Sequence, residues 1–222
     1  MSTTAPGHFV NRSRQALVVA AVCLAGFAAV AWQVVAEGAL TRWDAAIAER
    51  MYRFTRTDPD LYDGTLWLTD LNSGLPRTIL VVSVLAVLML DRRWGLVLVW
   101  LGSQWLSREL VSWSKEQFAR DRPGFPDTPM LAGGWAFPSG HAVGAVVTFE
   151  MLAYFLLRQM ERGWIRGALI GILAVLAFAI GLSRIMLGVH WFTDVLGGFL
   201  LGTAYIALWI ALVEWRRPRV AT

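Results

Sequence analysis

His190 and Asp194 are four residues apart, so on a helix they would occupy one face. A carboxylate bonded to one nitrogen of an imidazole fixes the tautomer of the ring and leaves the other nitrogen free to act as a base or a nucleophile. The spacing by itself does not decide for chemistry, because a structural hydrogen bond between the same two side chains would give the same pattern. Other residues of the chain are needed to choose between a catalytic pair and a structural hydrogen bond.

Lys115, Arg122 and Arg184 are cations near the ends of long apolar runs. Lys115 and Arg122 are seven residues apart, which places them two turns apart on one side of a helix that Pro123 would end. Arginine presents a planar fork of donors and lysine a compact charge, and both suit phosphate oxygens. These three side chains are therefore candidates for holding an anion.

The stretch Pro138-Ser139-Gly140-His141 has the composition of a helix start. Pro138 cannot continue a preceding helix, Ser139 suits the N-cap, and Gly140 lets a ligand approach the backbone closely. The free N–H groups of a first helical turn attract anions, and His141 would lie in that same turn. The stretch predicts an anion site that has a histidine within reach.

Composition indicates a polytopic membrane protein. The 222-residue chain is 56% hydrophobic and 16% charged, with a mean hydropathy of +0.51, whereas about a quarter of the residues in soluble domains are charged. The net charge of +4 comes from arginines scattered between apolar runs, which excludes the basic face that nucleic-acid binding needs. Cys23 is the only cysteine, so no disulfide framework exists within the chain.

The elements that must position these side chains are six apolar runs long enough to cross a bilayer. We expect a single all-α domain over residues 1–222, built as a bundle of six transmembrane helices. Arg12 and Arg14 precede the first run, but the length of that run favours a retained anchor over a cleaved signal peptide. The expected spans are 16–36, 71–90, 94–113, 139–157, 164–182 and 191–213.

Residues 40–54, between the first two spans, predict an amphipathic helix that lies in the membrane interface. Thr41 and Asp44 resemble a capping box, and Asp58-Pro59 would end the segment. The helix is either a rim at which a lipid head group enters the protein or a packed connector. Its apolar residues at helical spacing are Leu40, Trp43, Ile47, Met51 and Phe54.

The expected topology brings the candidate residues to one face of the membrane. Lys115, Arg122 and the Pro138–His141 stretch belong to the connection between the third and fourth spans, whereas His190 and Asp194 belong to the connection between the fifth and sixth. Two connections separated by two spans open on the same face. This convergence favours chemistry over a structural bond for the histidine–aspartate pair.

Taken in order, the three motifs resemble those of the type 2 phosphatidic acid phosphatase family. The motifs are Lys115-x6-Arg122-Pro123, Pro138-Ser139-Gly140-His141 and Ser183-Arg184-x5-His190-x3-Asp194. The resemblance covers residues 115–194 directly, and the six-span layout extends it over most of the chain.

The resemblance implies a role for each matched residue. His190 would attack phosphorus and form a phosphohistidine, Asp194 would orient it, and His141 would protonate the leaving alkoxide and later help to activate water. No cofactor is implied, and no group of metal ligands has suitable spacing, so side-chain cations would occupy the place that Mg²⁺ takes in other phosphoryl-transfer enzymes. The phosphate-binding residues would be Lys115, Arg122, Ser139, Gly140 and Arg184.

We therefore expect an integral membrane phosphatase that hydrolyses a phosphomonoester or pyrophosphate of a lipid, with no nucleic-acid partner and with its oligomeric state open. Candidate substrates are phosphatidic acid, phosphatidylglycerol phosphate, undecaprenyl pyrophosphate and the phosphates of lipid A. A lipid phosphotransferase remains an alternative, because its motifs would look the same. A non-catalytic lipid-phosphate binding or transport protein is the other alternative, although a carrier needs no nucleophile.

The distribution of basic residues predicts the orientation in a bacterial inner membrane. Both termini and the short connections around Arg92–Arg93 and Arg158–Arg166 share one face and are rich in arginine. Most of the basic residues on the other face either bind phosphate or lie in longer connections, where they say less about orientation. The positive-inside rule therefore predicts cytoplasmic termini and an active site that faces the periplasm.

Three further features of the sequence carry expectations of their own. Glu150 would lie near the middle of the bilayer, either as part of a polar path or as a protonated acid bonded to a neighbouring helix. Asp121 is expected to be solvated. The Gly167/Gly171 and Gly198/Gly202 patterns are expected to pack helices within the chain.

Overall fold

The computed structural model describes residues 7–128 and 134–216, and all the regular structure in these residues is helical. The expected all-α fold class is confirmed. The helices are α1 (Gly7–Val35), α2 (Ala39–Arg56), α3 (Pro59–Asp70), α4 (Gly74–Leu90), α5 (Trp94–Phe118), α6 (Gly140–Gln159), α7 (Trp164–Met186) and α8 (Phe192–Trp215).

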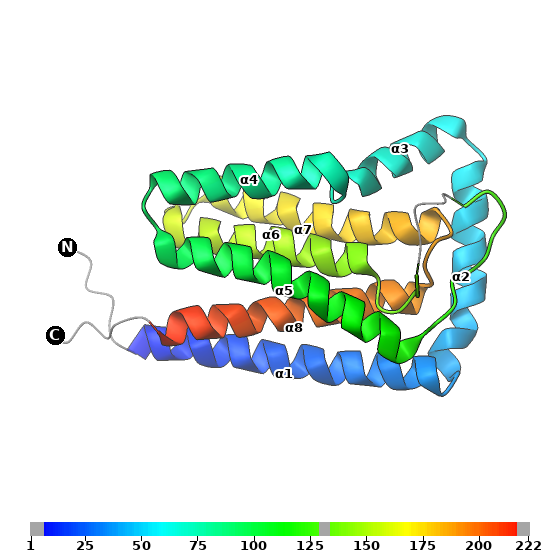
Figure 1. The fold of residues 1–222 in the computed structure, drawn as a ribbon, viewed down its shortest axis with the longest axis horizontal. Coiled ribbons are helices and arrows are strands. Elements are labelled where there is room, and N and C mark those ends of the chain that lie inside the picture. Colours follow the sequence, from blue (N-terminus) through cyan, green and yellow to red (C-terminus); the bar gives the residue numbers. More distant parts are fainter. Residues whose placement is uncertain (1–6, 129–133, 217–222) are drawn as a thin grey trace.

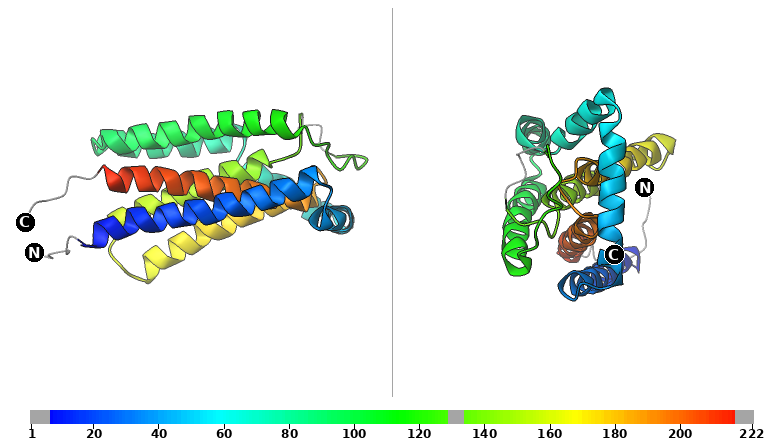
Figure 2. Two further views of the ribbon diagram at one scale, coloured as in Figure 1. Left: turned by 90° about the horizontal axis from the view of Figure 1, so that it is seen from below. Right: turned by 90° about the vertical axis from the view of Figure 1, so that its right-hand side faces the viewer.

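Six of these helices, α1 and α4–α8, run side by side as a bundle, and α2 lies across one end of it (Figures 1 and 2). The helices α1, α6, α7 and α8, together with the continuous stretch from α3 through α4, are long and apolar enough to cross a membrane. Helix α5 is more polar but spans the same length of the bundle (Figure 1). The six expected spans correspond to these six helices, with boundaries that differ by at most five residues except at the start of α1, which begins nine residues before the expected span.

Helix α3 was not expected as a separate element. The Asp58-Pro59 pair does end the preceding segment, since α2 stops at Arg56, but it also begins the next helix. Pro59 occupies the first turn, where its missing N–H costs nothing, and the Asp58 side chain accepts a hydrogen bond from the Asp60 amide. Helix α3 then leads into α4 through a bend at residues 71–73 (Figure 1).

Helix α2 is amphipathic as expected, but the proposed capping box does not form. The Thr41 hydroxyl donates to the Gly38 carbonyl, and the helix has no side-chain cap. Asp44 is instead buried and faces the bundle, as do Ala48 and Thr55. The local sequence cannot show whether Asp44 caps α2 or is buried against the bundle, because the residue that binds it lies far along the chain.

Helix α6 is the most deeply buried of the bundle helices, and close contact with α8 keeps it there. A Cβ atom on Gly198 would lie 2.8 Å from the Ala142 Cβ, and one on Gly202 would lie 2.9 Å from Val146. The expectation that this glycine pair packs helices is confirmed. It is wrong for Gly167 and Gly171, whose added Cβ atoms would meet nothing within 4 Å.

Candidate active site

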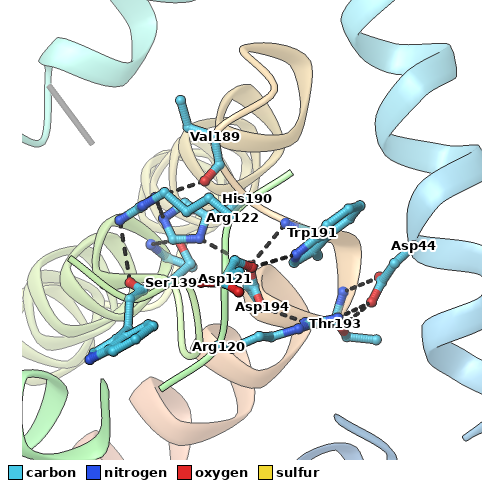
Figure 3. A network of polar contacts seen from close by, with 12 residues as sticks. Asp44, Arg120, Asp121, Arg122, Ser139, Val189, His190, Trp191, Thr193 and Asp194 are labelled. Carbon is cyan, nitrogen blue, oxygen red and sulfur yellow. Dashed lines mark hydrogen bonds and ion pairs between the residues drawn. The ribbon is translucent and has the colours of Figure 1, made fainter. Parts of the chain in front are cut away.

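The motif residues meet at the end of the bundle that α2 covers. The loop after α5, the start of α6 and the turn from α7 into α8 all lie at this end, and the first and last described helical residues lie at the other (Figure 1). The expectation that the two connections share one end of the bundle is confirmed. Figure 3 shows the polar contacts that join them.

His190 and Asp194 form the expected pair, with 3.2 Å between the His190 Nδ1 and Asp194 Oδ2 atoms. The same oxygen accepts a 2.9 Å hydrogen bond from the Trp191 amide, so the carboxylate is fixed from two sides. Both side chains are buried. Because a carboxylate next to Nδ1 favours a proton on that nitrogen, Nε2 carries the unprotonated lone pair.

The surroundings of His190 hold its ring in the neutral form. Burial, followed by the positive charges of Arg122, Arg184 and Lys115, lowers the pKa of His190 well below its ordinary value. A neutral imidazole at physiological pH is the form that can donate an electron pair from Nε2.

Arg122 is fixed beside the Nε2 atom of His190. Its Nη1 atom lies 3.1 Å from the His190 Nε2 atom and donates a 2.7 Å hydrogen bond to the Val189 carbonyl. Further bonds reach the carbonyls of Gly134 and Trp135, and the latter carbonyl also accepts from Lys115. The loop backbone therefore holds both cations of the first motif at one place. Figure 3 shows Arg122 beside His190.

The start of α6 has the geometry expected of an anion site. Ser139 is the N-cap, and its hydroxyl accepts from the Ala142 amide at 3.5 Å. The Ser139 amide donates to the Asp194 carbonyl at 3.0 Å, which ties this turn to the first turn of α8. The first N–H groups of a helix have no partner within it, so those of Gly140 and His141 are placed to meet a ligand.

Arg184, in the last turn of α7, completes the set of phosphate-binding candidates. It is 6% exposed, and its Nη1 atom donates a 2.8 Å hydrogen bond to the Thr69 hydroxyl of α3. Its Nε atom has no hydrogen-bond partner among the residues that the structure describes. His141 lies within the electrostatic reach of both Arg184 and His190. A buried guanidinium N–H group without a partner could donate a hydrogen bond to an incoming phosphate oxygen.

Arg120 and Asp44 belong to the site and were missed as site residues. Arg120 donates a 2.6 Å bond from Nη1 to the Asp194 Oδ1 atom and a 2.7 Å bond from Nη2 to the Asp44 Oδ2 atom. Thr193 joins the same network: its amide donates to Asp44 at 2.9 Å, and its hydroxyl accepts from Arg120 at 2.7 Å. Helix α2 is thus connected to Asp194 through one arginine (Figure 3).

The sequence held one signal for this network. Asp44 lies on the same helical face as Ala48 and Thr55, whose small side chains indicate packing against another element. Asp121 behaves as expected and is exposed, although its carbonyl accepts a bond from the Trp191 indole at 2.8 Å.

The profile of the PAP2 superfamily matches residues 92–218, which is more than half of the chain and includes all three motifs. The chain belongs to the PAP2 superfamily. Among curated members, phosphatidylglycerophosphatase B of Bacillus subtilis (strain 168) is 41% identical over 90 residues. That alignment covers 40% of this chain and 43% of the relative, so it spans less than half of either protein.

Two solved structures resemble the fold, and the first of them is PAP2-type. The crystal structure of a transmembrane PAP2-type phosphatidylglycerolphosphate phosphatase from Bacillus subtilis aligns with a TM-score of 0.79 at 28% identity. The alignment covers 89% of this chain and 97% of that one. The crystal structure of Aquifex aeolicus LpxE aligns with a TM-score of 0.53 at 23% identity over 76% of this chain and 94% of its own, which supports the fold alone. The polytopic membrane architecture is thus shared with a solved PAP2 enzyme.

Proposed function

We propose that this PAP2 protein is an integral membrane phosphatase that removes a phosphate group from a lipid through a phosphohistidine intermediate. The observation that carries the proposal is the placement of His190. Its Nδ1 atom is held by Asp194, while its Nε2 atom lies 3.1 Å from the Arg122 guanidinium. A nucleophile aimed at a bound phosphoryl group needs this arrangement, whereas a lipid carrier needs only the cation.

In the proposed first step, the Nε2 lone pair attacks phosphorus, and the bond from phosphorus to the lipid oxygen breaks. His141 donates a proton to that oxygen, so the lipid leaves as an alcohol and not as an alkoxide. Water then attacks the phosphohistidine, His141 accepts a proton from it, and inorganic phosphate leaves with His190 restored. Asp194 stabilises the positive charge that the His190 ring carries in the intermediate.

The remaining motif residues would stabilise the transferring phosphoryl group. Phosphoryl transfer depends mainly on positioning and on cations placed where charge spreads over the equatorial oxygens. Lys115, Arg122 and Arg184 would supply those charges, and Ser139 with the Gly140 backbone would orient the group. This set predicts activity without a metal ion, so hydrolysis should persist in EDTA and should be inhibited by orthovanadate, a mimic of five-coordinate phosphorus.

The favoured substrate is phosphatidylglycerol phosphate, because the names of the Bacillus subtilis matches, in sequence and in structure, carry that activity. Phosphatidic acid, undecaprenyl pyrophosphate and lipid A phosphates are the other candidates. A site at the end of the bundle can take a head group while the acyl chains remain in the bilayer. We place the protein in the bacterial inner membrane with this end toward the periplasm.

The test is phosphate release by purified protein in mixed micelles of each candidate lipid, without an added acceptor. Release from at least one lipid is expected, and His190→Ala should abolish it because no other nearby group can form the covalent intermediate. His8→Ala is the matched control, since His8 lies in α1 at the opposite end of the bundle. Near-normal hydrolysis by folded His190→Ala protein would rule out the phosphohistidine mechanism. If phosphate leaves the lipid only when an acceptor is added, the protein is a phosphotransferase.

A further inference from the structure

A second cluster of cations lies next to the candidate active site but takes no part in the three motifs. Arg77, in the first turn of α4, and Arg108, in α5, line a cavity of about 180 Å³ between α4, α5 and α6. Gly140 and Gly144 of α6 form its other side, so the cavity adjoins the proposed phosphate-binding turn.

No carboxylate lines this cavity, and no ion pair neutralises either arginine within the described residues. Arg77 donates a 3.2 Å hydrogen bond to the neutral Gln104 amide, and the positive charges of Arg77 and Arg108 act on each other. The remaining polar lining consists of serine hydroxyls. Arg77 is half-buried and Arg108 is exposed, so two like charges meet at this cavity with no acidic group among the described residues that line it. An anion bound between the two guanidinium groups would relieve their repulsion.

Close packing fixes Arg77 at the cavity wall. A Cβ atom on Gly144 would lie 3.2 Å from the Arg77 Nη1 atom, so the guanidinium rests directly against α6, one turn beyond His141. The Arg77 side chain is held between this contact and its bond to Gln104. The position is prepared before any ligand arrives.

The cavity lies on the bilayer side of the phosphate-binding turn. Arg108 precedes Lys115 by seven residues, which is about 10 Å along a helix that runs toward the active-site end. A lipid whose terminal phosphate reaches His190 would therefore place the next part of its head group near Arg77 and Arg108. The second phosphorus of a pyrophosphate shares an oxygen with the first and would stay among the motif cations.

We propose that Arg77 and Arg108 form a second phosphate subsite, which binds the phosphodiester of a glycerophospholipid whose head group carries a terminal phosphomonoester. The inference rests on the proposed phosphatase function and gives a reason why the protein would prefer a lipid with two separated phosphates over a lipid with one. Such a substrate carries two phosphates separated by a spacer, whereas phosphatidic acid has one phosphate and leaves the subsite without an anion.

The experiment compares kcat/KM for phosphatidylglycerol phosphate and phosphatidic acid with the same acyl chains in the same micelles. The decisive variant is Arg108→Gln, because Arg108 is exposed and its loss should leave the fold intact. Losing one charge-assisted contact should lower kcat/KM for phosphatidylglycerol phosphate about tenfold and that for phosphatidic acid less than about twofold. Arg77→Gln should show the same bias, and Arg108→Lys should recover part of the loss.

Arg92→Gln is the matched control, since Arg92 lies between α4 and α5 at the far end of the bundle, and it should change neither value. Equal losses on both lipids, or no loss on either, would overturn the subsite while leaving the phosphatase function intact. If the wild-type protein releases phosphate from neither these lipids nor the other candidates, the function itself fails and the subsite falls with it.

Discussion

The Asp194 carboxylate accepts hydrogen bonds from three groups at once. Its Oδ2 atom accepts from the His190 ring and the Trp191 amide, and its Oδ1 atom accepts from Arg120. A carboxylate with partners on both oxygens cannot rotate, so the direction of the His190 Nε2 lone pair depends on all of them. Arg120 is therefore a positioning residue that acts on the nucleophile through the aspartate.

Replacing Arg120 should lower kcat much more than it raises KM. A small displacement of a reacting group costs on the order of 100-fold in rate, so we expect a loss of about 10–100-fold in Arg120→Gln. Arg120→Lys should recover little, because a point charge cannot bridge the Asp44 and Asp194 carboxylates as the guanidinium fork does. Steady-state kinetics checks this, and a normal kcat in folded Arg120→Gln protein would remove Arg120 from the catalytic machinery.

The pH profile of activity should have its acid limb at a lower pH than an ordinary histidine would give. Burial and neighbouring cations lower the pKa of His190, so the ring stays neutral to a lower pH than an ordinary histidine, whose pKa is about 6.5. The acid limb of the kcat/KM profile, which reports the free enzyme, should therefore lie below about pH 6.5. For the same reason, the unfolded chain binds a proton at this residue that the folded protein does not, so this group makes stability rise with pH up to about pH 6.5. An acid limb above that value would mean that His190 is not shielded as the structure indicates.

Packing between helices sets the distance between the two motif-bearing turns. The start of α6 carries Ser139 and His141, the start of α8 carries Asp194, and the Ser139 amide donates to the Asp194 carbonyl. Gly198 permits this approach, because a side chain there would strike both Ala142 and the Ser139 carbonyl.

Gly198→Ala should impair stability and activity together. The added Cβ would lie 2.9 Å from the Ser139 carbonyl oxygen, and a backbone atom cannot move aside without shifting the phosphate-binding turn. We expect a destabilisation of about 1–3 kcal/mol, as for other overpacked cores, and a fall in kcat. Gly171→Ala is the control and should be neutral, since its Cβ would meet nothing within 4 Å. Thermal unfolding and phosphate release measure both effects, and equal behaviour of the two variants would contradict this account of the α6–α8 contact.

Part of the helix arrangement and of the candidate site could be predicted from the sequence. Apolar length placed the six bundle helices, and counting membrane crossings brought Lys115, Arg122, Ser139, His190 and Asp194 to one end. The expectation that Lys115 and Arg122 share one side of a helix ended by Pro123 was wrong, since α5 ends at Phe118 and Arg122 lies in the loop after it. The role of Asp44 was wrong, since a Thr-x-x-Asp pattern looks like a cap unless its partner is known. That partner, Arg120, is 76 residues away. Helix α3 was missed because one Asp-Pro pair both ends a helix and begins the next.

For the molecule as a whole, the two ends differ, and under the proposed function this difference decides which lipid pool the protein can use. The active site and α2 occupy one end, while α1 begins and α8 ends at the other (Figure 1). Trp43 and Phe54 are exposed on α2, which suits a helix that rests in the head-group layer. The arginines around Arg92 and Arg162 lie at the end that we assign to the cytoplasm.

Cysteine labelling in intact cells should confirm that the active site faces outward. In a Cys23→Ser background, a membrane-impermeant maleimide should label Pro126→Cys in the loop after α5 but not Arg162→Cys in the connection between α6 and α7. Labelling of both positions after permeabilisation shows that each thiol is reactive. The reverse pattern in intact cells would mean that the enzyme acts on cytoplasmic lipid.

The common location of the first turn of α1 and the last turn of α8 has a practical consequence. A fluorescent reporter or an affinity handle attached through either helix would sit away from the reaction centre, on the side where the bundle has no motif residues (Figure 1). Two different reporters, one through each helix, would be neighbours and could signal to each other in a single molecule. Protein captured through such a handle on a solid support would present its catalytic end uniformly to lipid supplied from the opposite side.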